Sequence, residues 1–139
     1  MKAKIILLTL TAAVLIGTAG IAARPRPPQS QPEMNADAAR ELRSAESQMQ
    51  ELLSTLTAKA KGHPEALAKL NRAQAAWVTY RDAHLDSLWP SADTLRSYGS
   101  VHPMCVLMER KKLTMQRIAE LRLMLKAEEG EVCFGAWPE

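Results

Sequence analysis

The stretch from residue 67 to residue 88 limits most strongly what this chain can fold into. Seven of its residues recur at alternating intervals of three and four positions: Leu67, Leu70, Gln74, Trp77, Arg81, His84 and Leu88. This spacing is typical of one face of an α-helix. No run of six residues here alternates apolar and polar side chains, as a half-buried strand would. The stretch therefore predicts a long helix from Pro64 to about Leu88.

The centre of this helical face is polar, although a plain core would place Leu or Ile there. Gln74, Trp77 and Arg81 lie on it, with Tyr80 and Asp82 beside them. A buried, unpaired Arg costs several kcal/mol. Arg81 must therefore either reach water or meet a carboxylate and carbonyl groups inside the fold. The residues form either a Trp and Arg binding hot spot or a structural polar cluster that fixes helix register. The second interpretation is favoured, because nothing beside them suits catalysis.

One further long helix is expected before residue 64 and another after residue 88. One should begin near Met34–Asp37, capped by Asn35 or Asp37, and run to about Ala60, where Gly62-His63-Pro64 breaks the pattern. Its apolar face contains Leu42, Ala45, Met49, Leu52 and Leu56. The other should run from about Pro103 to about Ala127. Its inward face contains Met104, Leu107 or Met108, Lys111, Thr114, Ile118, Leu121 and Leu125, with Arg117 adjacent.

These elements predict an all-α fold, an antiparallel bundle of three main helices. The short break at residues 62–64 predicts that the first two helices pack as an antiparallel hairpin. Trp89-Pro90 ends the middle helix, and residues 91–98 form a short extra helix in the second connection. Exposed loops on rigid scaffolds often carry recognition. Four residues of this connection are therefore candidate partner contacts: Trp89, Tyr98, Ser100 and His102.

The amino terminus has the pattern of a secretory signal peptide. A basic start containing Lys2 and Lys4 precedes an apolar run and small residues, which predicts a signal over residues 1–23 with cleavage after Ala22 or Ala23. An uncleaved inner-membrane anchor is the less favoured alternative. Cleavage lowers the net charge from +3 to +1, which argues against a nucleic-acid partner.

Two other segments fall outside the helical pattern. Residues 24–33 are rich in proline and are expected to form an extended linker. Residues 129–139 are expected to form an apolar tail that packs over one end of the bundle or on a partner.

The chain has only two cysteines, Cys105 and Cys133. An unbroken helix over 105–128 would separate its ends by roughly 35 Å, and the five remaining steps span at most about 18 Å. Bridged cysteines need Cα atoms within about 7 Å. No disulfide within the chain is therefore predicted, and both thiols are expected to be free or intermolecular.

Residues that would indicate catalysis or metal binding are scattered. His63, His84 and His102 lie in different elements without zinc-site spacing. The sequence shows no glycine-rich phosphate loop and no nucleophile motif. It therefore predicts a protein that is not an enzyme and has no metal site and no cofactor.

The run from Ala73 to Ala83, AQAAWVTYRDA, resembles the signature of the LprI N-terminal-like domain, a family of exported bacterial proteins named after lysozyme inhibition. Pro32-Glu33-Met34-Asn35 resembles the start of that domain. Its second half is similar to Gly99-Ser100, Pro103, Leu113-Thr114, Arg117 and Leu121. The resemblance implies a helical domain over residues 34–128. The motif positions that carry over are Gln74, Trp77, Tyr80, Arg81, Asp82, Thr114 and Arg117.

The resemblance implies a small periplasmic or secreted protein that binds a protein partner, with a lysozyme-type hydrolase as the candidate. The family's usual cysteine positions are occupied here by Asp37, Leu85 and Glu109, so inhibition in this chain would have to work without those bridges. Two alternatives stay open. One is a structural envelope protein that self-associates as a homodimer, and the other is a membrane-tethered adaptor whose signal is not cleaved.

Overall fold

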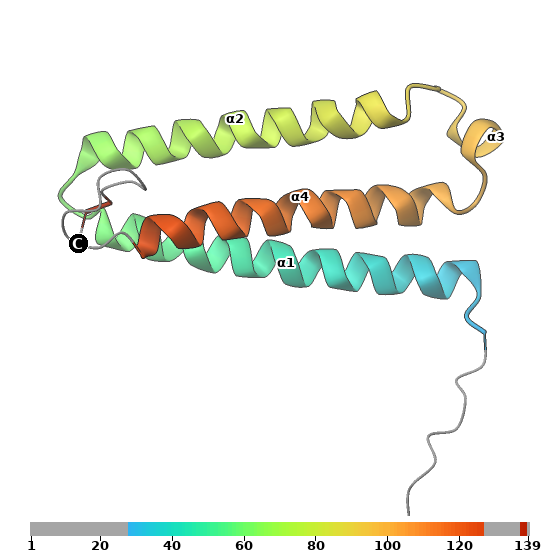
Figure 1. The fold of residues 1–139 in the computed structure, drawn as a ribbon, viewed down its shortest axis with the longest axis horizontal. Helices are drawn as coiled ribbons and strands as arrows, with labels where there is room; N and C mark the ends of the chain where they lie inside the picture. The colour runs from blue at the N-terminus through green and yellow to red at the C-terminus, as the bar shows by residue number, and fades with distance from the viewer. Residues whose placement is uncertain (1–27, 127–136, 139) are drawn as a thin grey trace, which may run out of the picture.

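The computed structural model describes residues 28–126 and 137–138. Their helices follow the order α1 (Gln31–Lys59), α2 (Pro64–Leu88), α3 (Thr94–Tyr98) and α4 (His102–Leu125). Three long helices run along the molecule, and α3 lies at the end where α2 finishes and α4 begins (Figure 1). The all-α prediction is confirmed, as are the three main helices and the short fourth. The predicted signal peptide and most of the predicted tail lie outside the described residues.

The beginning of α1 differs from the prediction. The helix starts at Gln31, so the expected start at 34–37 and a cap at Asn35 or Asp37 are wrong. Ser30 occupies the cap position instead, and its backbone N–H donates to the Glu33 carboxylate at 2.7 Å. Proline is tolerated in the first turn of a helix, where its missing N–H would be unpaired anyway. The proline-rich composition therefore hid the first turn of α1, and the expected linker boundary at residue 33 falls inside this helix.

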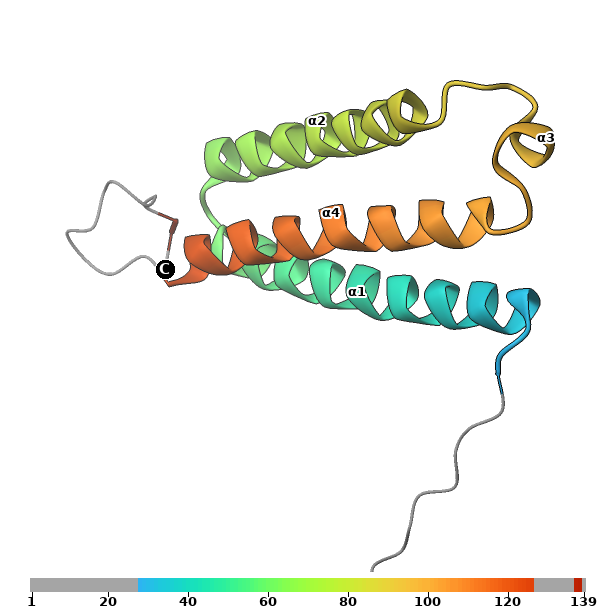
Figure 2. The same cartoon turned by 45° about the vertical axis from the view of Figure 1, so that its right-hand side comes forward.

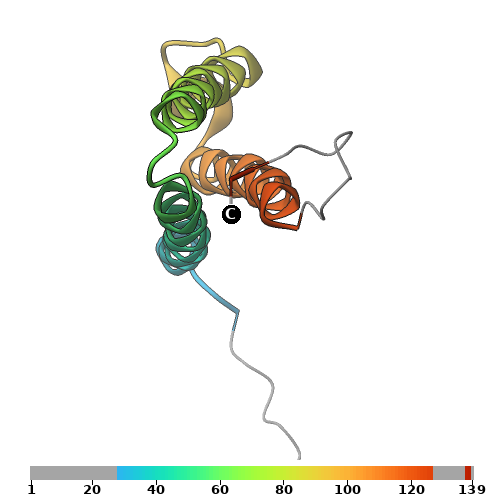
Figure 3. The same cartoon turned by 90° about the vertical axis from the view of Figure 1, so that its left-hand side faces the viewer.

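The closest helix pair is α1 with α4, and these two helices run in the same direction, with α2 antiparallel to both (Figures 1 and 2). The first two helices run antiparallel as expected, but the prediction that they pack against each other as a hairpin is wrong, because α1 packs mainly against α4. Viewed along the bundle, α2 stands apart on one side of the α1–α4 pair (Figure 3). Ala38 and Ala45 are buried on α1 and let α4 approach, whereas α2 presents Trp77 and Arg81. Helix separation depends on the side chains at the contact, so the bulky face of α2 keeps its backbone farther away.

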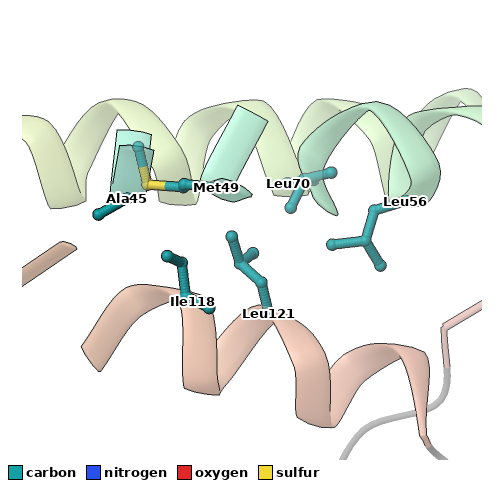
Figure 4. Close-up of a cluster of buried hydrophobic side chains, with 6 residues drawn as sticks. All are labelled: Ala45, Met49, Leu56, Leu70, Ile118 and Leu121. Atoms are coloured by element: carbon teal, nitrogen blue, oxygen red, sulfur yellow. The ribbon is translucent and has the colours of Figure 1, made fainter. Parts of the chain in front are cut away.

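The core lies toward the end of the bundle where α1 ends and α2 begins. Six buried side chains form it: Ala45, Met49, Leu56, Leu70, Ile118 and Leu121 (Figure 4). Trp137 packs against this cluster, and its indole N–H donates to the carbonyl oxygen of Leu56 at 3.0 Å. The one large tail side chain that the structure describes therefore covers the end of the bundle. No helix in the described part is long and apolar enough to cross a membrane.

The inward face of α2 drifts away from the predicted one toward its carboxyl end. Leu70 and Leu85 are its fully buried residues, whereas Leu88 is 45% exposed. A straight helix has 3.6 residues per turn, so a pattern of 3.5 rotates by about 20° per seven residues. Leu85 consequently replaces Leu88 on the buried side.

We expect α2 to open before α1 and α4 in native-state hydrogen exchange. Only two residues of α2 are buried, compared with five on α1 and four on α4. Segments with few buried apolar contacts open at lower free-energy cost than the core. Mass spectrometry of peptides from 64–88 and 102–125 should show faster exchange in the first. Equal protection of the two segments would contradict the loose packing of α2.

Candidate functional site

The polar centres of α2 and α4 meet, as their sequences suggested. Arg117 on α4 donates from Nε to the Gln74 Oε1 atom at 3.2 Å, and its Nη1 lies 2.8 Å from Glu120 Oε2. The amide nitrogen of Gln74 lies 3.7 Å from the sulfur of Met49 on α1. Gln74 therefore links all three long helices, and the Arg117 side chain is only 12% exposed in this position. This arrangement is a helix-to-helix connection and leaves little surface for a ligand.

Arg81 is paired with a carboxylate at the edge of the bundle. Its side chain is 13% exposed, and both Nε and Nη2 lie 2.9 Å from Asp82 Oδ1. The guanidinium carbon lies 5.2 Å from the centre of the Trp77 ring, which is within the range of a cation–π contact. Arg110 of α4 approaches Asp82 at 3.8 Å. Of the two alternatives for Arg81, the structure shows the one in which a carboxylate meets the cation.

The Asp82 carboxyl has a pKa below its ordinary value. The hydrogen bond from Arg81 is the main cause, and the positive charges of Arg81 and Arg110 act in the same direction. Partial desolvation opposes them. The ionised form of Asp82 is therefore favoured in the folded protein.

An Asp82→Asn variant should lose stability at neutral pH and lose none in acid. Because the folded-state pKa is lowered, the contribution of Asp82 is present above the ordinary value of 3.8 and disappears as the pH falls through the folded value. Asp82 is half exposed, so the effect at neutral pH should be below about 1 kcal/mol. Urea unfolding at neutral pH and well below pH 3.8 measures it. Asp86→Asn, an exposed acid on the same helix, is the control, and an equal loss there would contradict the role of the Arg81 pair.

The remaining motif residues have different environments. Tyr80 is 57% exposed and stacks on His84, with ring centres 5.7 Å apart. His84 in turn lies 3.8 Å from Glu109 on α4. Thr114 is completely buried, and its hydroxyl donates to the carbonyl oxygen of Arg110 at 2.9 Å. Thr114 therefore belongs to the interior, and Tyr80 is the motif residue with the largest exposed fraction.

Three of the four candidate partner residues form an aromatic cluster. The His102 ring stacks on Tyr98 at 5.1 Å and meets the edge of Trp89 at 5.3 Å. The Tyr98 hydroxyl accepts a hydrogen bond from the Ser91 backbone N–H at 3.0 Å. Ser100 is exposed and lies outside this cluster. The aromatic side chains thus hold the connection together from within.

The structure exposes two neighbouring residues that sequence reasoning missed, Leu95 and Arg96 on α3. Leu95 is 73% exposed, the highest value among the large hydrophobic side chains described. Asp93 caps the turn by accepting the Arg96 backbone N–H at 3.1 Å, and the Gly99 N–H closes it onto the Leu95 carbonyl. The Asp93-to-Arg96 spacing was a sequence signal for a capped turn. It could not show which side chains the turn presents to solvent.

The described residues offer little for metal or thiol chemistry. No group of three or more His, Cys, Asp or Glu residues within 28–126 and 137–138 could hold a metal ion. Cys105 is free and half buried, in a shallow apolar hollow beside Leu88, Trp89 and Met108. Cys133 lies outside the described residues, so the prediction that it forms no disulfide with Cys105 stays a prediction.

The family model described as "Lysozyme inhibitor LprI" matches residues 22–121 of this chain. The chain belongs to the LprI family. The matched segment contains the Gln74–Arg117 connection, the Arg81–Asp82 pair and the whole of the α2–α4 connection, whereas Trp137 lies beyond it. No curated protein and no solved structure matches the chain.

Membership in the LprI family gives the buried polar residues a family context. They lie in the matched region, where Gln74 bonds to Arg117 and Arg81 to Asp82. Gln74, Arg81, Thr114 and Arg117 use their polar groups within the bundle. The polar groups of these four motif residues are therefore engaged inside the protein in this structure.

Proposed function

We propose that this chain is an exported, non-catalytic inhibitor that binds a lysozyme-type hydrolase in the bacterial envelope. The match of the lysozyme inhibitor family over residues 22–121 is the observation that carries the proposal. Residues 1–23 serve as a cleaved signal in this account, and residues 34–128 form the binding domain. The partner is a protein, and no cofactor takes part.

The α2–α4 connection is the proposed contact surface. Gln74 and Arg117 of the motif are engaged between helices and Arg81 with Asp82 along α2. The connection, in contrast, lies at one end of the bundle (Figure 2). Its own aromatic cluster holds it together. Rigid, exposed loops bind with less ordering cost than flexible ones. Trp89 and His102 support the segment from within, and its exposed side chains touch the partner.

The direct test is inhibition of a lysozyme that clears a bacterial cell-wall suspension. The purified chain should slow clearing in proportion to its concentration and should bind the lysozyme in a sedimentation experiment. A protein that neither binds nor slows the lysozyme would overturn the proposal. Amino-terminal sequencing of the exported chain should show a start at Ala23 or Arg24 if the signal is cleaved as proposed.

A second candidate function is self-association as a structural envelope protein. The apolar hollow favours it, because Leu88 and Met108 are 45% and 55% exposed beside the free thiol of Cys105. A dimer in sedimentation that dissociates with reductant, together with unchanged lysozyme activity, would support this function. A monomer under both conditions would count against it.

A further inference from the structure

Resting on the proposed function, we infer that the α3 turn enters the substrate cleft of the hydrolase, with Arg96 facing its catalytic carboxylates and Leu95 filling an apolar subsite beside them. Two adjacent exposed side chains on α3 support this inference. Leu95 is the most exposed large hydrophobic residue described, and Arg96 is exposed next to it.

The Arg96 guanidinium is available for a partner. Within residues 28–126 and 137–138, no carboxylate lies within ion-pairing distance of it, which is also true of Arg43, Arg72 and Arg122, whereas Arg81 and Arg117 are paired. Asp93 is close in sequence, but one of its carboxylate oxygens caps the backbone N–H of Arg96. The side chain of Arg96 is therefore free to pair outside the molecule, and its planar fork suits a carboxylate.

The turn that carries these residues is fixed at several points. The two hydroxyls of Ser91 and Ser97 lie 2.7 Å apart, and the Ser91 N–H donates to the Tyr98 hydroxyl. Gly99, with a φ of 70°, ends the turn in a conformation that other residues adopt only with strain. The contacts that fix the turn use none of the Leu95 or Arg96 side-chain atoms. The turn is therefore organised before binding and presents both side chains at no further ordering cost to the backbone.

The shape and chemistry of a glycosidase cleft complement this turn. Such a cleft is concave and mostly apolar, with a few placed polar groups. Two carboxyl groups flank the scissile bond, about 5–5.5 Å apart in retaining enzymes. A projecting turn with one cation and one aliphatic side chain matches that pattern. α3 lies at the end of the bundle, beyond the last residues of α2 (Figures 1 and 2).

Local charge at the turn, not the charge of the whole molecule, explains the attraction. The predicted mature chain carries a net charge of only +1, which gives no long-range attraction to a basic hydrolase. A cation placed in the cleft next to ionised carboxylates acts at contact distance, where water is excluded and screening is weak. Binding should therefore depend on Arg96 more than on any other exposed Arg.

The test compares substitutions in the α3 turn with matched substitutions on α1 and α4. Arg96→Gln and Leu95→Ser should each weaken inhibition of the retaining lysozyme by roughly tenfold to hundredfold, as expected for interface hot spots. The controls are Arg43→Gln on the exposed side of α1 and Leu123→Ser on α4, where the side chain is 54% exposed. Circular dichroism and melting temperatures should match the wild type for all four variants, because none of these side chains is buried.

A competition experiment tests whether the cleft is the site. A soluble oligosaccharide of N-acetylglucosamine, which fills the cleft, should displace the wild-type chain from the lysozyme. A lysozyme whose nucleophilic carboxylate, the one that stays ionised, is replaced by the amide should bind the chain more weakly, and that difference should vanish with Arg96→Gln. Wild-type inhibition that survives both α3 substitutions, or binding that the oligosaccharide does not reduce, would overturn this inference and leave the proposed function standing. Absence of any binding or inhibition by the wild type would overturn the proposed function itself.

Discussion

Replacement of Leu121 by alanine should lower the free energy of unfolding by about 2–5 kcal/mol, the range for truncating a fully buried leucine. Leu121 is completely buried on α4, in the cluster with Leu56 and Ile118. Truncation would remove apolar contacts and leave a cavity in the α1–α4 interface, where the main core lies. Small domains have a total stability of about 5–15 kcal/mol, so the loss is a large share. Urea unfolding followed by circular dichroism measures it.

The control for this prediction lies two residues away on the same helix. Leu123 is 54% exposed, so Leu123→Ala should change the free energy of unfolding by less than about 0.5 kcal/mol. Both substitutions remove the same atoms and have the same effect on helix propensity. A similar loss for the two variants would mean that the α1–α4 interface is not the core.

Replacement of Trp77 by alanine should cost roughly 2–3 kcal/mol, below the about 3–5 kcal/mol of a fully buried aromatic residue because Trp77 is half buried. The ring packs against the core cluster, and the Arg81 guanidinium lies over it. The variant loses both the apolar contact of α2 with the core and the cation–π contact. Thermal and urea unfolding should show this loss, and the remaining folded protein should still inhibit the lysozyme at wild-type strength.

Tyr80→Ala is the matched control on α2, because Tyr80 is a motif residue with 57% of its surface exposed. Its substitution should change stability by less than about 0.5 kcal/mol. A Trp77→Ala variant that keeps its stability but no longer binds the lysozyme would contradict the architectural role. It would identify the motif as contact surface instead.

The helices were predictable where the sequence contains strong local signals. Pro64 and Trp89-Pro90 delimit α2, and its structural bounds agree with the expected ones because proline restricts the backbone on both sides. The start of α1 was missed because Pro32 lies inside the first turn. The pairing of α1 with α4 was also missed. It depends on the small size of Ala38 and Ala45 relative to Trp77, which helical periodicity does not register.

The polar side chains between α2 and α4 were partly predictable from the sequence, whereas the exposed side chains of α3 were not. The sequence places polar side chains near the middle of both α2 and α4, and the structure brings Gln74 and Arg117 together, a specific contact that the sequence did not predict. For Arg81 the sequence left two alternatives open, contact with water or with a carboxylate, and the structure shows the second, with Asp82 as the partner. The exposure of Leu95 and Arg96 depends on how the turn is oriented by contacts across the connection. The spacing of residues within 91–98 does not determine how the turn is oriented.

The pairing of the first helix with the last has a consequence for the order in which the chain can fold. The apolar stripe of α1 finds its main partner only in α4, whose core residues Ile118 and Leu121 come late in the chain. Contacts this distant in sequence form late, because the intervening segment must first close into a loop. A chain still attached to the ribosome therefore lacks its main core until almost all of it has emerged.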